Sequence, residues 1–244
     1  MTGPLVDTDA LTIYDPTTRP LSFVILEVLV IAFGTATFFH ARRSKLARVT
    51  WITIVVYGLI MEALSYMVVQ NFAHGQFTVM LWAAQLPLYI IFVYPVLLYT
   101  GISAGRALRL PRAIEPIACG LCILALDVPF DLAGPPMGWW RWWGGDPNTA
   151  VRWGGVPVTS FYWHLAFGAA LAGVTAFAAR RGWTHATMAL PLALATIVIG
   201  VIAFMPMHLF AALGLGHDVF VATAIAGSAA LVAITVVRRG TLVA

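Results

Sequence analysis

The chain has 244 residues, of which 61% are hydrophobic and 10% charged, with a formal net charge of +4 and a mean hydropathy of +0.89. Soluble domains are about 45–50% apolar and about 25% charged. This composition therefore excludes a soluble enzyme, a nucleic-acid-binding module and a disordered chain. A spanning helix needs about 20 mostly apolar residues, so we predict an all-α polytopic membrane protein.

The first nineteen residues are polar, and no basic segment precedes an apolar stretch. We expect residues 1–19 to form an extracytoplasmic tail and not a signal peptide. Hydropathy and helix breakers then predict one domain of seven transmembrane helices over 20–237, followed by a cytoplasmic tail over 238–244. The expected helices are 20–41, 48–70, 77–104, 113–132, 157–179, 185–207 and 217–237.

The positive charges predict the orientation of these helices. Eleven of the fourteen Lys and Arg residues lie in the connections after the first, third and fifth helices and at the C-terminal end. The other three are Arg19, Arg141 and Arg152. Because cytoplasmic loops are enriched in Lys and Arg, we expect the N-terminus outside, the C-terminus in the cytoplasm and the plasma membrane as the location.

Acidic residues lie inside the predicted spans, where ionisable side chains are costly and often functional. Glu27, Glu62 and Asp127 are internal, and Asp131 lies at the outer end of the same helix as Asp127. No predicted span holds an internal Lys or Arg. Counting from the helix ends places all four acids in the outer half of the membrane. Such a cluster is expected to keep at least one proton, as a general acid requires.

Two histidines, His164 and His208, are expected in the same outer layer. Together with the acids, they could bind zinc or iron through nitrogen and oxygen ligands. However, no H-x-x-x-H or E-x-x-H pair places two ligands on one helix face. We therefore predict no metal and no cofactor, and we interpret the acids as proton donors and acceptors.

The long connection over 133–156 is expected to be an outer loop, and it is rich in tryptophan. An aromatic belt at the membrane interface is one explanation. The other is a lid whose ring faces line a polar pocket and stabilise cations. On the second interpretation, the substrate-binding residues are Glu27, Tyr66, Tyr89, Trp139, Trp140, Trp143, Trp163 and His208.

Several motifs follow one another in the middle of the chain. Glu62 is followed by NFAHGQF, LPLYIIFVYP, the acid pair of LDVPFD, the run MGWWRWW and the stretch GGVPVTSFYWHLAF. Over roughly residues 55–170, this order resembles the integral-membrane carotenoid biosynthesis family that includes the bacterioruberin-type carotenoid hydratases. The chain departs from that family at Leu132, where Pro is usual, at Thr159 and Ser160, where Asn is usual, and at His164.

The resemblance implies an enzyme that protonates an isoprenoid double bond of a lipophilic polyprenoid or carotenoid. Hydration, cyclisation and isomerisation all remain open. From its depth we expect Asp127 to be the proton donor, with Glu62, Asp131 and His164 as further catalytic residues. The competing hypotheses are a proton-coupled transporter or channel, a non-catalytic lipid-binding subunit and a metal-dependent lipid hydrolase. The bilayer is the other expected partner, and nucleic acid is not.

Overall fold

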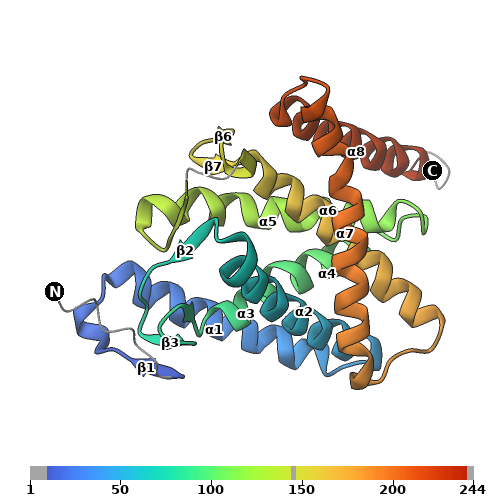
Figure 1. Ribbon diagram of the computed structural model, residues 1–244. Coiled ribbons are helices and arrows are strands. Elements are labelled where there is room, and N and C mark those ends of the chain that lie inside the picture. Colours follow the sequence, from blue (N-terminus) through green and yellow to red (C-terminus); the bar gives the residue numbers. More distant parts are fainter. Residues whose placement is uncertain (1–9, 144–146, 241–244) are drawn as a thin grey trace.

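The computed structural model describes residues 10–143 and 147–240 (Figure 1). In this part of the chain, seven helices are long and apolar enough to cross a membrane, which confirms the predicted all-α polytopic class. Four of them are single helices: α1 (Leu21–Ala41), α5 (Glu115–Met137), α6 (Val158–Arg180) and α8 (His217–Gly240). The second joins α2 (Lys45–Leu64) to the π-helical turn η2 (Ser65–Val69), and the third joins α3 (Ile90–Tyr94), the π-helical turn η3 (Pro95–Tyr99) and α4 (Thr100–Ala107). The sixth is α7 (Ala189–Ala212), preceded by the 3-10 turn η5 (Ala186–Met188).

The main core lies between the helices, around α5 and α6. Tyr57 of α2, Ile123 of α5 and Leu171 of α6 are buried in it. Many large apolar side chains of α1, α7 and α8 are instead exposed, including Phe33 and Ile202. Outward-facing apolar side chains are what a helix bundle presents to lipid. The fold therefore matches a multi-pass membrane protein.

Helices α5 and α6 approach each other closely at Gly120. A Cβ atom added at Gly120 would lie 2.3 Å from the backbone oxygen of Leu165. Small residues at a helix interface allow this kind of backbone approach. Asp127 lies two turns after Gly120 on α5, and His164 immediately precedes Leu165 on α6. The close contact therefore brings the acidic part of α5 against α6.

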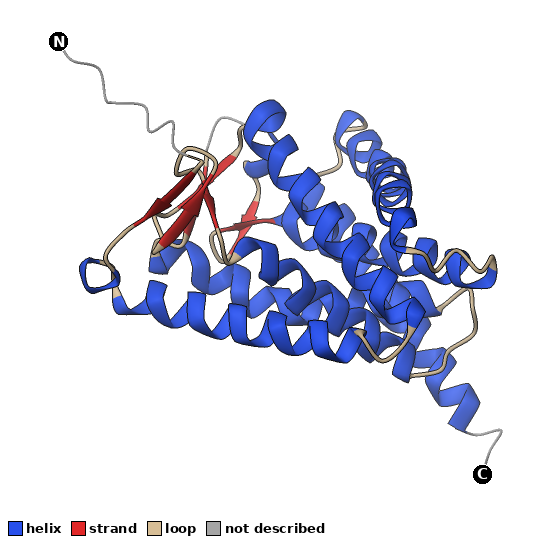
Figure 2. Cartoon of the chain, turned by 90° about the horizontal axis from the view of Figure 1, so that it is seen from below, coloured by secondary structure: helices blue, strands red, loops and turns tan. Residues whose placement is uncertain are grey.

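Short strands gather toward one end of the molecule (Figure 2). The strands β1, β3 and β4 form one antiparallel sheet, β2 pairs with β5, and β6 pairs with β7. We call these seven strands and the connections between them the strand cap. Its elements are β1 (Leu11–Ile13), β2 (Phe72–His74), β3 (Val79–Leu81), β4 (Leu86–Pro87), β5 (Trp140–Trp142), β6 (Arg152–Trp153) and β7 (Val156–Pro157), with the 3-10 turns η1 (Pro16–Thr18) and η4 (Pro147–Thr149).

The predicted start of the third helix at residue 77 is wrong. Residues 79–81 and 86–87 form strands, and the spanning helix begins only at Ile90. Between these two strands, Trp82, Ala83 and Ala84 have φ values of 54–56°, in the left-handed region that no helix of L-residues continues. A short apolar run has the same hydropathy whether it folds as a strand or as a helix. Here, pairing with other strands favours the strand.

Further boundaries differ from the prediction, among them the end of α7, which lies at Ala212 and not at residue 207. Part of the expected tail, residues 11–13, is strand β1, which pairs with β3, while residues 1–9 lie outside the described part. The expected loop 133–156 begins later, because α5 continues through Pro135 and Pro136 and ends at Met137. The following Gly138 adopts a φ of 75°, a common helix-ending conformation. Residues 144–146 of this loop and 241–244 of the expected C-terminal tail are also outside the described residues.

Candidate active site

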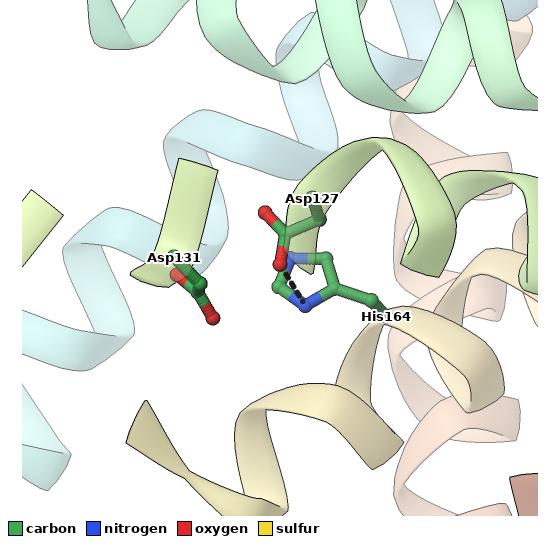
Figure 3. A group of neighbouring side chains, drawn as sticks. All are labelled: Asp127, Asp131 and His164. Atoms are coloured by element: carbon green, nitrogen blue, oxygen red, sulfur yellow. Dashed lines mark ion pairs between the residues drawn. The ribbon is translucent and has the colours of Figure 1, made fainter. Parts of the chain in front are cut away.

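Helix α5 holds two buried carboxyl groups one turn apart. Asp127 is 2% exposed and Asp131 is 5% exposed. Their spacing of four residues places them on one helix face. Pro129 lies between them within the helix and has no backbone N–H to donate. Figure 3 shows both side chains beside His164 of the neighbouring helix.

Helix α6 supplies the polar partners of this pair. Ser160 Oγ donates a hydrogen bond to Asp131 Oδ2 over 2.6 Å, a short distance typical of a charge-assisted bond. His164 Nδ1 lies 2.9 Å from the backbone oxygen of Ser160 and 3.0 Å from Asp127 Oδ2. We assign the Nδ1 proton to the Ser160 oxygen, which leaves Nε2 of a neutral ring as an acceptor. We call Asp127, Asp131, Ser160 and His164 the aspartate centre.

One oxygen of the aspartate centre has no hydrogen-bond partner in the part of the chain that the structure describes. Asp127 Oδ2 is close to His164 Nδ1 but makes no hydrogen bond with any described residue. The two observations agree once the Nδ1 proton points to the Ser160 oxygen, because the carboxyl oxygen is then near the ring without receiving its proton. Buried polar atoms in native proteins are nearly always satisfied. The free oxygen therefore suits a proton, a water molecule or a ligand.

The aspartate centre also has the composition of a metal site. Ligand atoms of Asp127, Asp131 and His164 all lie within 4.8 Å of one another. Two carboxylates and an imidazole are ligands that zinc, iron and manganese accept. Both carboxyl groups would have to be ionised to bind such an ion. The sequence expectation of no metal stays a prediction.

A second polar group is built around Glu62 of α2, which is 4% exposed. The Tyr94 hydroxyl donates to Glu62 Oε1 over 2.9 Å, and His74 Nε2 lies 3.2 Å from Glu62 Oε2. Glu62 comes three residues before the π-helical turn η2, and Tyr94 directly precedes the π-helical turn η3. Such turns occur frequently at functional sites. We call Glu62, His74 and Tyr94 the glutamate centre.

Both centres line one cavity of about 350 Å³, near the lower end of the usual range of about 300–1,000 Å³ for ligand pockets. Its walls come from α2, η2, α3, η3, α5, α6 and α7, and from β2, β5 and η4 of the strand cap. Among the described residues that line it, none is Lys or Arg. Most of the lining is apolar or aromatic, and its large rings include Tyr89, Phe130, Trp140, Trp163 and Phe167.

Comparison with known proteins places the chain in a family. A family model described as "Domain of unknown function (DUF7802)" matches residues 9–233. The chain belongs to this DUF7802 family. No curated protein and no solved structure matches the chain. The matched segment contains every residue of both centres.

The DUF7802 fold brings most of the predicted site residues together. All four predicted catalytic residues line the cavity, as do four of the eight predicted substrate-binding residues. These four are Tyr89, Trp140, Trp163 and His208. Trp140 reaches the cavity because Gly134 has no side chain: a Cβ atom there would lie 2.1 Å from the Trp140 ring. Burial and the nearby Glu62 raise the pKa of Tyr89 well above its usual value, so its phenol stays protonated.

The other four predicted substrate-binding residues do not line the cavity. Glu27 accepts hydrogen bonds from the backbone N–H groups of Thr78 and Val79, at 3.1 and 3.2 Å, and so holds strand β3. The Tyr66 hydroxyl donates to the backbone oxygen of Gln85. The rings of Trp139 and Trp143 contact Phe130 and Arg141, respectively.

Several polar or aromatic cavity residues are not among the predicted site residues. They include His74, Tyr94, Trp142 and Ser160. His74 lies in the stretch NFAHGQF, residues 71–77, and Ser160 precedes His164 by one helical turn. The i, i+4 spacing of Ser160 and His164 was the available signal, since residues so spaced share a helix face. Nothing in the local sequence around His74 indicates that its partner is Glu62, twelve residues earlier.

Proposed function

We propose that this DUF7802 protein is a multi-pass enzyme of the plasma membrane that protonates a double bond of a lipophilic polyprenoid or carotenoid. The observation that carries this proposal is the aspartate centre, which lies in a mainly apolar cavity with no Lys or Arg among its described lining residues. Two carboxylates so close in a low-dielectric site repel each other strongly. One shared proton removes that repulsion and provides a general acid.

Asp127 is the better proton donor of the two. Asp131 already accepts a short hydrogen bond from Ser160, which stabilises its ionised form. Asp127 Oδ2 has no hydrogen-bond partner among the described residues. A proton on that oxygen is free for transfer to a carbon atom of a bound double bond. The π electrons then form the new C–H bond, and Asp127 is left as a carboxylate.

The cavity lining suits the carbocation that such protonation creates. The rings of Trp163 and Phe167 stack with their centroids 3.9 Å apart, and both residues line the cavity. Aromatic ring faces attract cations, by about 2 kcal/mol or more where water is excluded. Water addition followed by loss of a water proton gives a tertiary alcohol, and loss of a neighbouring C–H proton gives an isomer. Capture by another double bond forms a ring and a new cation, which then loses a proton. In each outcome, a proton carries the positive charge away.

The substitution Asp127→Asn tests this proposal. Asn keeps the shape of the side chain but supplies no transferable proton, so turnover should fall by at least about 100-fold, the low end for general acid catalysis. The measurement is mass-spectrometric profiling of pigments from a carotenoid-producing host, normalised to protein that elutes as a folded species in detergent gel filtration. Full activity of the Asn variant would contradict the proposal, because the acid pair would then serve only to pack the helices.

Metal-dependent chemistry is the second candidate, because the ligand atoms of Asp127, Asp131 and His164 lie within 4.8 Å of one another. A bound divalent ion would neutralise the two carboxylates in place of the shared proton. The two candidates differ in what purified active protein contains. A stoichiometric metal would favour this second candidate over acid catalysis.

A further inference from the structure

We propose that the glutamate centre is a second, separate proton-transfer centre, which removes the proton that leaves during turnover while Asp127 supplies the proton that enters. In this scheme Glu62 is the base, and His74 is a positioning residue that also passes the proton on toward the strand cap. The inference rests on the proposed function and deepens it, because it assigns the two proton transfers to two different walls of the cavity.

The first observation is that the two centres are distinct within one cavity. The aspartate centre is built on α5 and α6, whereas Glu62 is on α2 and His74 is on strand β2. Glu62 lies outside the group formed by Asp127, Asp131 and His164. Each centre combines a buried carboxyl group with an imidazole ring, so each has the groups needed to give or take a proton.

The second observation concerns the Glu62 carboxylate. Each of its oxygens has its own partner: Tyr94 donates to Oε1, and His74 Nε2 is next to Oε2. Hydrogen bonds that donate to a carboxylate stabilise its ionised form. A base has to be in its carboxylate form before it accepts a proton, and the Tyr94 bond favours that form of Glu62. Asp127, in contrast, has an oxygen without a partner among the described residues that can carry the proton to be given. This asymmetry is the reason for assigning proton donation to Asp127 and proton removal to Glu62.

The third observation is a free nitrogen on His74. The side chain is 5% exposed, and its Nδ1 is buried without a hydrogen-bond partner among the described residues. A buried polar atom of this kind calls for a partner such as a water molecule. An imidazole that contacts a carboxylate through one nitrogen and water through the other can move a proton between them. Because β2 belongs to the strand cap, His74 links Glu62 to that end of the protein.

The proton balance closes for either product type. Asp127 gives its proton to a carbon atom, and the π electrons form the C–H bond. In hydration, a water oxygen then forms a bond to the cation and releases a proton to Glu62. In isomerisation, a neighbouring C–H bond breaks, its electron pair forms the new double bond, and its proton goes to Glu62. With the ring proton of His74 on Nδ1, Glu62 passes the accepted proton to His74 Nε2 while Nδ1 releases its own proton to water, and Asp127 recovers a proton from water.

Deuterium labelling separates the two centres. Purified full-length protein in detergent is incubated in D₂O with lycopene as the probe, and both the product and the recovered lycopene are analysed by mass spectrometry. With Glu62→Gln, we expect product formation to fall by at least about 100-fold. Recovered lycopene should still gain deuterium, because Asp127 can add a deuteron and then remove a proton from the same carbon. With Asp127→Asn, neither molecule should be labelled.

The role of His74 is tested by chemical rescue. His74→Ala should lower product formation by at least about 10-fold, and added imidazole should restore it, which it would not do if the ring were only structural. His185→Gln is the matched control, since His185 is exposed and does not line the cavity. Three results would overturn the inference. Glu62→Gln could turn over at the wild-type rate, lycopene recovered with that variant could carry no label, or imidazole could fail to rescue His74→Ala. Absence of both product and label with wild-type protein would instead refute the proposed function itself.

Discussion

The close approach of α5 and α6 provides a quantitative test of how the site is built. In Gly120→Ala, the new methyl group would lie 2.3 Å from the backbone oxygen of Leu165, a contact that no side-chain rotation relieves. An ordinary van der Waals contact is longer by about 1 Å. The helices must therefore separate by a similar amount, and overpacking of this kind costs about 1–3 kcal/mol.

That separation also reaches the aspartate centre, because the interface that contains Gly120 holds Asp131 against Ser160. A displacement of about 1 Å at a catalytic group can lower turnover by about 100-fold. The control is Gly173→Ala on α6, where the nearest atom to the added methyl group is 3.8 Å away, an ordinary contact. Thermal unfolding in detergent and turnover per folded protein should both fall for Gly120→Ala and stay near wild type for Gly173→Ala. Equal behaviour of the two variants would refute the argument that backbone contact sets the site.

Three further predictions test the other parts of the scheme. Glu27→Gln should lower the free energy of unfolding by about 1.5–3 kcal/mol, because it weakens charge-assisted bonds to strand β3. Turnover per folded protein should change little, and a large loss of turnover with unchanged unfolding would contradict this prediction. Elemental analysis of pure, active protein should find no stoichiometric zinc, iron or manganese, and finding one would favour the metal-dependent candidate. A membrane-impermeant thiol reagent applied to intact cells should label Ala150→Cys and not Arg112→Cys, and the reverse pattern would invert the predicted topology.

The sequence by itself determined that the chain is a helical membrane protein and which acids are buried. Hydropathy and the cost of placing charges in lipid are properties of each segment, so they can be read without knowing its neighbours. This is why the predicted α1 and α6 nearly match the observed ones. It is also why Glu62, Asp127 and Asp131 are all found buried, at 4%, 2% and 5% exposure.

Tertiary structure decided which of the buried groups meet. Counting residues from a helix end gives the depth of a side chain, but it gives neither the neighbouring helices nor the direction in which the side chain points. Glu27 and Glu62 both satisfied the depth criterion, yet Glu27 holds strand β3 while Glu62 lines the cavity. His74 pairs with Glu62 only because residues 72–74 fold as a strand against β5. Helix rotation and strand pairing depend on contacts between distant segments, and those contacts exist only in the folded chain.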